Sequence, residues 1–170
     1  MTRRIALLIV AGLAACAPAE PADRREAPLP NAVLGTWRMT SATMEAPDGG
    51  VSRPYGDRPN GLLVFTPDMR FIEVLTPTDH PPFASDVRGE GTEAENRRAM
   101  PTSIGFFGVY SVDAHGVFAG NRVDGSTFPN WVGDVRTRED LTLAVEGDRM
   151  TERFTRPDGG RVSAEFERVR

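Results

Sequence analysis

The sequence contains no lysine: all 20 of its basic residues are arginine. Schiff-base chemistry and the phosphate-binding lysine of a P-loop are therefore excluded. Two histidines and one cysteine are too few for a dedicated zinc site, and neither His-x-x-x-His nor Cys-x-x-Cys spacing occurs. With 24 acidic residues and a net charge of −4, the chain has no basic surface signal for nucleic acid. We expect no metal, no cofactor and no nucleic-acid partner.

The sequence also lacks an apolar run long enough to cross a membrane as a helix, which takes about 20 residues. Its N-terminal apolar stretch, residues 5–13, follows Arg3 and Arg4 and has the length of a signal-peptide core. Residues 13–16, Leu-Ala-Ala-Cys, resemble a bacterial lipobox, and Cys16 is the only cysteine. We predict a lipoprotein signal peptide over residues 1–15 and lipidation of Cys16. An ordinary signal peptide with a chance or buried cysteine is the alternative.

Lipidation of Cys16 would attach the protein to a membrane of the bacterial envelope. Residue 17 is Ala, and not the Asp that retains lipoproteins in the inner membrane of enteric bacteria, so we expect the outer membrane, facing the periplasm. Residues 16–31 contain four prolines and almost no large apolar side chain, which predicts a semi-extended spacer. The folded domain is expected over residues 32–170.

From residue 32 onward the pattern is one of strands and tight turns, rich in Gly and Pro. Apolar alternation is clearest near the C-terminus, where Leu141, Leu143 and Val145 share a face. Thr92 and Glu95 fit a capping box, which predicts one short helix over residues 93–100. The predicted strands cover residues 34–44, 61–65, 71–75, 104–112, 117–123, 137–146, 149–155 and 161–169. About eight antiparallel strands joined by short hairpins predict an all-β, up-and-down barrel.

The first predicted strand begins with a Gly-x-Trp, Gly35 to Trp37. Alternation places Trp37, Met39 and Ser41 on one face of this strand. Glycine permits a tight backbone entry, and the tryptophan supplies a large apolar body with one N–H donor. In a small closed barrel, such a tryptophan plugs one end.

Several segments resemble the lipocalin-like domain family of bacteria and fungi, over about residues 32–170. They are Leu-Gly-Thr-Trp at 34–37, Arg-Pro-Tyr-Gly at 53–56 with Pro59 and Gly61, Phe-Thr-Pro-Asp at 65–68, His-Pro-Pro-Phe-Ala at 80–84, and Gly-Ser-Thr-Phe-Pro-Asn-Trp-Val-Gly at 125–133. The resemblance implies a lipocalin-like barrel with a cavity for a small apolar molecule. It also implies that an arginine of the last strand, Arg168, stacks over the plug residue Trp37.

The function we expect is binding or carriage of a small hydrophobic ligand, in preference to catalysis. The candidate cavity and rim residues are aromatic or polar: Phe83, Phe106, Tyr110, Phe128, Asn130 and Trp131, with Arg122 as a polar anchor. His80 is included because histidine titrates near neutral pH. Phe128 and Trp131 fit equally well as core residues that plug the barrel, and His80 fits a solvated loop.

Two other functions stay open at this point. A barrel isomerase or cyclase would need a buried polar group, for which His80, Glu73 and Glu152 are the candidates. The two glutamates lie on strands, so register alone decides whether they face inward. A filled barrel with a structural or partner-binding role in the envelope would instead expose a contiguous apolar patch.

Overall fold

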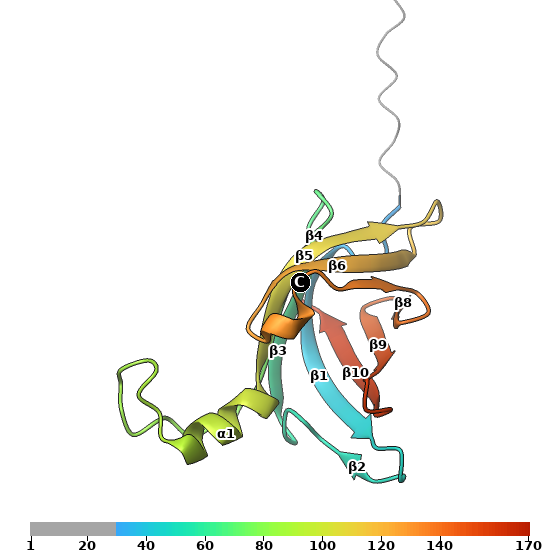
Figure 1. Ribbon diagram of the computed structural model, residues 1–170. Coiled ribbons are helices and arrows are strands. Elements are labelled where there is room, and N and C mark those ends of the chain that lie inside the picture. Colours follow the sequence, from blue (N-terminus) through green and yellow to red (C-terminus); the bar gives the residue numbers. More distant parts are fainter. Residues whose placement is uncertain (1–29) are drawn as a thin grey trace, which may run out of the picture.

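The computed structural model describes residues 30–170 of the protein (Figure 1). The predicted signal peptide, Cys16 and most of the predicted spacer lie outside the described residues. Among residues 30–170, no helix combines the length and the apolar character needed to span a membrane.

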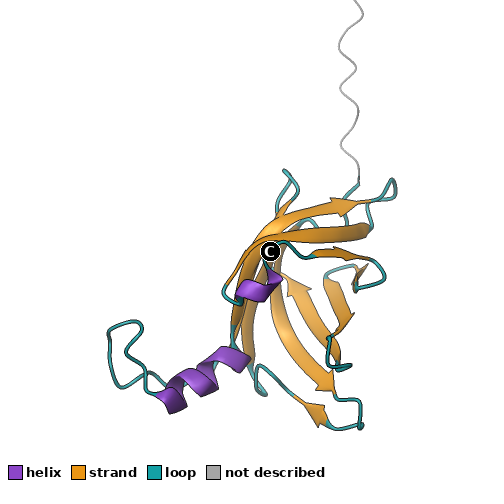
Figure 2. Ribbon diagram, in the orientation of Figure 1, coloured by secondary structure: helices purple, strands orange, loops and turns teal. Residues whose placement is uncertain are grey.

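The regular secondary structure of the described chain is mostly β-strand (Figure 2). The strands are β1 (Gly35–Glu45), β2 (Val51–Ser52), β3 (Pro59–Phe65), β4 (Arg70–Pro77), β5 (Ile104–Val112), β6 (Phe118–Ser126), β7 (Val135–Thr137), β8 (Leu141–Glu146), β9 (Arg149–Thr155) and β10 (Arg161–Arg168). The helices are α1 (Glu93–Thr102) and the single 3-10 turn η1 (Pro129–Trp131).

The strands form one antiparallel sheet in the order β7-β6-β5-β4-β3-β1-β10-β9-β8, with β2 paired to β1. The sheet curls until β6 approaches β8, which gives a nearly closed barrel. The predicted all-β barrel is therefore confirmed. The strands beyond the predicted eight are the short β2 and β7, which the alternation pattern did not separate from their surroundings.

The region predicted as one strand over residues 137–146 is broken into β7 and β8. The backbone N–H and the hydroxyl of Thr137 both donate to the Asp140 carboxylate at 2.9 Å, which closes a tight turn between them. Because of this turn, β7 pairs with β6 while β8 pairs with β9. The break carries the chain from one edge of the sheet to the other and brings the barrel close to closure.

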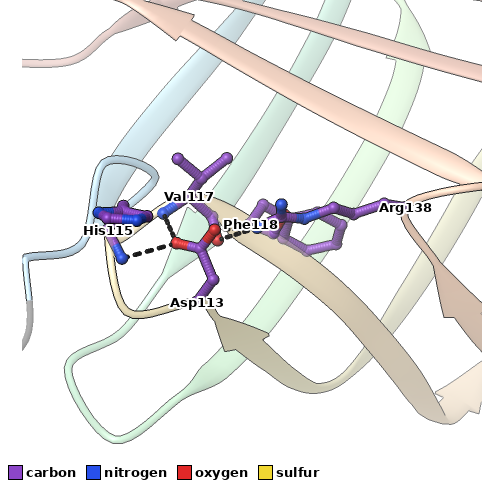
Figure 3. A network of polar contacts seen from close by, with 5 residues as sticks. All are labelled: Asp113, His115, Val117, Phe118 and Arg138. Carbon is purple, nitrogen blue, oxygen red and sulfur yellow. Dashed lines mark hydrogen bonds and ion pairs between the residues drawn. The ribbon is translucent and has the colours of Figure 1, made fainter.

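Arg138, which lies in the turn between β7 and β8, also contacts the turn between β5 and β6 (Figure 3). The Arg138 guanidinium donates to the Phe118 carbonyl and to the Asp113 carboxylate, at 2.7 Å each. Asp113 also accepts the backbone N–H groups of His115 and Val117 at 2.9 and 3.0 Å (Figure 3). These donors, with Arg138 first, lower the pKa of Asp113 to about 2. His115 supplies only its backbone here, and its side chain is exposed.

Trp37 plugs the end of the barrel where β1 begins. Its side chain is 0% exposed, and its indole N–H donates to the Val33 carbonyl at 2.7 Å. The guanidinium carbon of Arg168 lies 4.0 Å from the centre of the Trp37 ring, and this side chain also donates to the carbonyls of Ala32 and Leu34. The structure thus holds the cation–π pair at the plug through both the ring and the backbone.

One register expectation on β1 was wrong. Trp37 and Met39 face the core, but a β-bulge between Met39 and Ser41 shifts the alternation. Ala42, and not Ser41, is the next fully buried residue. A bulge adds one residue to a strand, so a period of two no longer holds across it.

The predicted helix is confirmed as α1, and its capping box is present. The Thr92 hydroxyl accepts the Glu95 backbone N–H at 3.3 Å, and the Glu95 carboxylate accepts the Thr92 N–H at 2.7 Å. No residue of α1 is buried, and the helix projects away from the barrel wall (Figure 1). The helix is therefore an appendage of the barrel and no part of its core.

Close backbone approach at a bulge in β5 makes a glycine necessary at position 108. A Cβ on Gly108 would lie 1.9 Å from the Arg122 carbonyl oxygen, so backbone would have to move. We expect Gly108→Ala to lower the free energy of unfolding by about 1–3 kcal/mol, as overpacking does. Gly105→Ala, on the same strand but with its nearest neighbour at 3.5 Å, is the matched control and should cost less than half as much. Urea unfolding measures both, and equal losses would contradict this interpretation.

Candidate functional site

Two glutamate side chains face the interior of the barrel from opposite walls. Glu73 on β4 is 3% exposed and Glu152 on β9 is 5% exposed. In the sheet order, β3, β1 and β10 separate β4 from β9. Their cross-strand neighbours are apolar: Leu63, Phe106, Leu143 and Ala164. Register, which the sequence left open, therefore places both carboxyl groups inside.

These carboxyl groups are poorly solvated. Burial is the main cause that raises the pKa of Glu152 to about 7. Burial and the neighbouring charge of Glu152 together raise the pKa of Glu73 well above its usual range. The Oε1 atom of Glu73 is shielded from solvent and has no hydrogen-bond partner among the described residues. An ionised carboxylate is strongly disfavoured in such a place, so the pair retains a proton at neutral pH.

Arg136 on β7 supplies the positive charge that acts on both glutamates. Its charge opposes the rise in pKa of Glu73 and of Glu152. The side chain is 18% exposed, and its guanidinium carbon lies 4.7 Å from the centre of the Trp131 ring and 5.5 Å from that of Phe106. The two rings meet edge to face at 5.3 Å. The Arg136 guanidinium thus lies over the aromatic pair formed by Phe106 and Trp131.

Tyr55 joins this group from the loop between β2 and β3. Its side chain packs against the core, and burial is the main cause that raises the pKa of its hydroxyl. The charges of Glu73 and Glu152 raise it further, so the hydroxyl lies within electrostatic range of both. We call Tyr55, Glu73, Arg136 and Glu152 the interior polar cluster.

Two of the four cluster residues were absent from the candidates taken from the sequence. Arg136 lies in a three-residue strand too short for an alternation signal, and nothing in the pattern singles it out. Tyr55 appeared only inside the Arg-Pro-Tyr-Gly segment. The polar anchor expected at Arg122 is not in the interior: its side chain is 56% exposed and pairs with Asp124 at 3.0 Å. Because Val123 faces the core, its neighbour Arg122 faces solvent.

Only some of the aromatic candidates predicted from the sequence lie next to the interior polar cluster. Phe106 and Trp131 lie against Arg136, whereas Phe128 and Asn130 are exposed, with the Phe128 ring 5.9 Å from that of Trp131. Tyr110 is a core residue. Its hydroxyl donates to the Thr66 carbonyl at 2.8 Å and accepts from the Asn31 amide at 2.7 Å.

The loop before α1 carries the remaining two candidates. Phe83 is half-buried against Gly91, just before the helix. His80 is half-buried, and its Nε2 atom has no hydrogen-bond partner among the described residues. No interaction found in the described chain links either residue to the interior polar cluster.

The cluster combines a hydrogen-bond donor and an acceptor with a fixed cation. Two carboxyl groups with unequal, raised pKa values can hold one proton between them near pH 7, so one acts as an acid and the other as a base. Within residues 30–170, no group of three or more His, Cys, Asp or Glu side chains is placed to hold a metal ion. The chemistry that these residues offer is hydrogen bonding and proton transfer.

Comparisons with known proteins give one informative match. The sequence profile of the lipocalin-like domain matches residues 34–163. A search of functionally curated proteins finds no match. Among solved structures, a de novo designed fluorescence-activating β-barrel is 18% identical with a TM-score of 0.39, covering 81% of this chain and 94% of that one. A redesigned β-barrel is 16% identical with a TM-score of 0.38, covering 85% and 100%.

Proposed function

This chain belongs to the lipocalin-like domain family, and from that premise we propose that it binds a small, mainly apolar molecule inside the barrel. The observation that carries this proposal is the interior polar cluster. A barrel core gains no stability from a carboxyl group that is buried without a hydrogen-bond donor, because desolvation is unfavourable. Such groups are typical of binding sites, where a ligand supplies the missing partner.

The apolar wall around the cluster would supply most of the binding free energy. Burial of apolar surface contributes about 25 cal/mol per Å². Phe106 and Trp131 are the aromatic side chains that lie against Arg136 of the cluster. The carboxyl groups would fix the orientation of one polar group on the ligand, as a few polar side chains do in most small-molecule sites.

We place this barrel on the bacterial envelope, attached through lipid on Cys16. Support comes from the basic residues, apolar run and lipobox-like ending of residues 3–16. A Pro-rich spacer of the predicted length would let the barrel stand up to about 45 Å from the outer membrane, on its periplasmic side. Metabolic labelling with an alkynyl palmitate tests this: the wild type should be labelled and Cys16→Ser should not. A labelled Cys16→Ser variant, or an unlabelled wild type, would overturn the anchor.

The binding proposal is tested with the dye N-phenyl-1-naphthylamine and the full chain carrying Cys16→Ser. We expect saturable binding of one dye per chain, with energy transfer from the Trp131 indole. Phe106→Ala should weaken binding about tenfold, which corresponds to about 1.4 kcal/mol. Phe107→Ala is the matched control, because Phe107 is the next residue on β5 and faces outward.

Two results would overturn the proposal. One is the absence of saturable dye binding by a chain whose circular dichroism shows a folded barrel. The other is an equal loss of binding in Phe107→Ala and Phe106→Ala. In the second case, the dye would bind the exposed apolar side chains on the outer face of β3, β4 and β5: Leu62, Ile72, Val74 and Phe107. That outcome favours the partner-binding role.

A further inference from the structure

We propose that the outer wall of the barrel formed by β3, β4 and β5 docks on a lipid bilayer. This wall carries four large apolar side chains that are 46–52% exposed, which we call the outer apolar patch: Leu62, Ile72, Val74 and Phe107. The inference rests on the proposed lipid attachment of Cys16 and deepens it, because it states which face of the barrel meets the membrane.

The four side chains of the patch are neighbours on one face of the sheet. Leu62 on β3 lies opposite Val74 on β4. Two residues away on β4, Ile72 shares this face and lies opposite Phe107 on β5. The Phe107 ring leans toward β6, since a Cβ on Gly125 would lie 2.6 Å from the ring carbons. The patch is therefore continuous from β3 to the edge of β6.

The wall on the other side of the barrel, formed by β8, β9 and β10, is polar (Figure 1). The outward side chains of β9 are Arg149, Thr151, Arg153 and Thr155. The strand β10 turns outward an arginine, a serine and two glutamates, and β8 presents no apolar side chain larger than Ala144. Both walls have the same strand alternation, so alternation does not explain why large apolar side chains gather on one of them. A contiguous exposed apolar patch of this kind marks an interaction surface.

The described chain begins at the end of the barrel from which β4 starts. The Asn31 amide donates to the Tyr110 hydroxyl, which in turn donates to the Thr66 carbonyl, in the turn between β3 and β4. Ile72 and Val74 lie about 7 and 13 Å along β4 from its first residue. The spacer that leads from Cys16 to this end reaches up to about 45 Å, so a lipid on Cys16 leaves the patch free to lie on the same bilayer.

Arginine side chains border the patch. Arg38 on β1 lies opposite Leu62. Arg70 on β4 and Arg122 on β6 lie on either side of Val109, which continues the outer face of β5. The side chains of Arg70 and Arg122 are more than half exposed, and each pairs with a neighbouring aspartate. Arginine can cover apolar surface with its stem and place its charge among lipid phosphate groups.

The shape of the patch also favours a bilayer as its partner. The patch lies on the outside of a sheet that curls into a nearly closed barrel, so its surface is convex. A fluid bilayer adapts to a convex surface, whereas a folded protein partner would need a matching concave surface.

The test places a tryptophan reporter on each wall of the full chain carrying Cys16→Ser. Phe107→Trp reports on the patch, and Thr142→Trp, at an exposed position of β8, is the matched control. The vesicles contain phosphatidylethanolamine, phosphatidylglycerol and a lipid brominated on its acyl chains, which quenches tryptophan inserted at the interface. After subtraction of the parent signal, we expect the Phe107→Trp reporter to lose about half its fluorescence and the Thr142→Trp reporter to lose none. Residues 5–13 are common to all variants, so they do not account for a difference between the two positions.

A second pair of variants tests whether the patch causes the quenching. Ile72→Asp in the Phe107→Trp chain should abolish it, because a charge at the centre of the patch opposes burial in the bilayer. Thr142→Asp in the same chain should leave it unchanged. Circular dichroism confirms that each variant is folded.

Three results would overturn the proposal. They are equal quenching at positions 107 and 142, no quenching at position 107, and quenching at position 107 that survives Ile72→Asp. If sedimentation velocity instead finds dimers that Ile72→Asp dissociates, the patch is an interface between copies of this chain, and the membrane assignment is overturned. The tested chain carries no lipid at residue 16, so these results are independent of the palmitate labelling that tests the attachment itself.

Discussion

Raising the pH from 5 to 8.5 is expected to lower the free energy of unfolding by at least about 2.5 kcal/mol. The pKa of Glu152 is about 7 in the folded barrel against a usual value of 4.5, so between these pH values the folded state binds more protons than the unfolded chain. Stability then falls as pH rises, and each unit of displacement corresponds to about 1.36 kcal/mol. Burial and the charge of Glu152 raise the pKa of Glu73 as well, so Glu73 adds to the loss. Urea unfolding at a series of pH values measures the slope.

Variants of the two carboxyl groups test the origin of this slope. Glu152→Gln and Glu73→Gln remove an ionisable group each, so each should flatten the decline and raise stability at pH 8.5 relative to wild type. Glu146→Gln, on the solvent face of β8, should keep the wild-type slope. Carboxyl groups with lowered pKa values, such as Asp113, titrate below pH 5 and do not contribute in this range. A flat wild-type profile, or stability that rises with pH, would contradict the burial of the pair.

Replacement of Trp37 by alanine is expected to lower the free energy of unfolding by about 3–5 kcal/mol. The ring is fully buried, so the variant loses apolar burial and leaves a cavity at the plugged end. It also leaves the Val33 carbonyl without its indole donor and removes the ring beneath the Arg168 guanidinium. Urea unfolding at pH 6 gives the value.

Two further variants identify which contacts matter at the plug. Trp37→Phe retains much of the apolar burial but loses the N–H donor, so its loss should be intermediate. Trp131→Ala is the control: Trp131 is only partly buried, against Phe106, so its replacement should cost less than Trp37→Ala. A loss below about 1 kcal/mol in Trp37→Ala would show that the plug does not hold the barrel together.

Much of the fold could be predicted from the sequence because its signals are local. Alternation at Leu141, Leu143 and Val145 places these side chains on the inner face, and the Thr92–Glu95 capping box marks the start of the helix. Local pattern did not reveal the bulge after Met39 or the break at Thr137. Both depend on which strand pairs with which, and that is decided by the closed sheet as a whole.

The interior polar cluster could be predicted from the sequence only in part, because its residues meet only in the folded barrel. Glu73 and Glu152 were recognised as candidates only on the condition of an inward register, which pairing with their neighbours decides. Arg136 could not be singled out, because a three-residue strand gives no periodicity and Phe106, one of its two aromatic partners, comes from a distant segment. The interior polar cluster forms only in the folded barrel, which brings side chains from four separate segments of the chain into one core.

Two ionisable carboxyl groups, Glu73 and Glu152, lie inside the barrel, and NMR titration tests whether they are buried there. Protein labelled with ¹³C at the glutamate side-chain carboxyls would be titrated from pH 4 to 9, with Glu73→Gln and Glu152→Gln used to assign the signals. We expect one resonance that titrates near pH 7 and is absent in Glu152→Gln, and a second that titrates well above the usual range of glutamate and is absent in Glu73→Gln. If every glutamate instead titrates at its usual value near 4.5, the two carboxyl groups are solvated and the interior site does not exist.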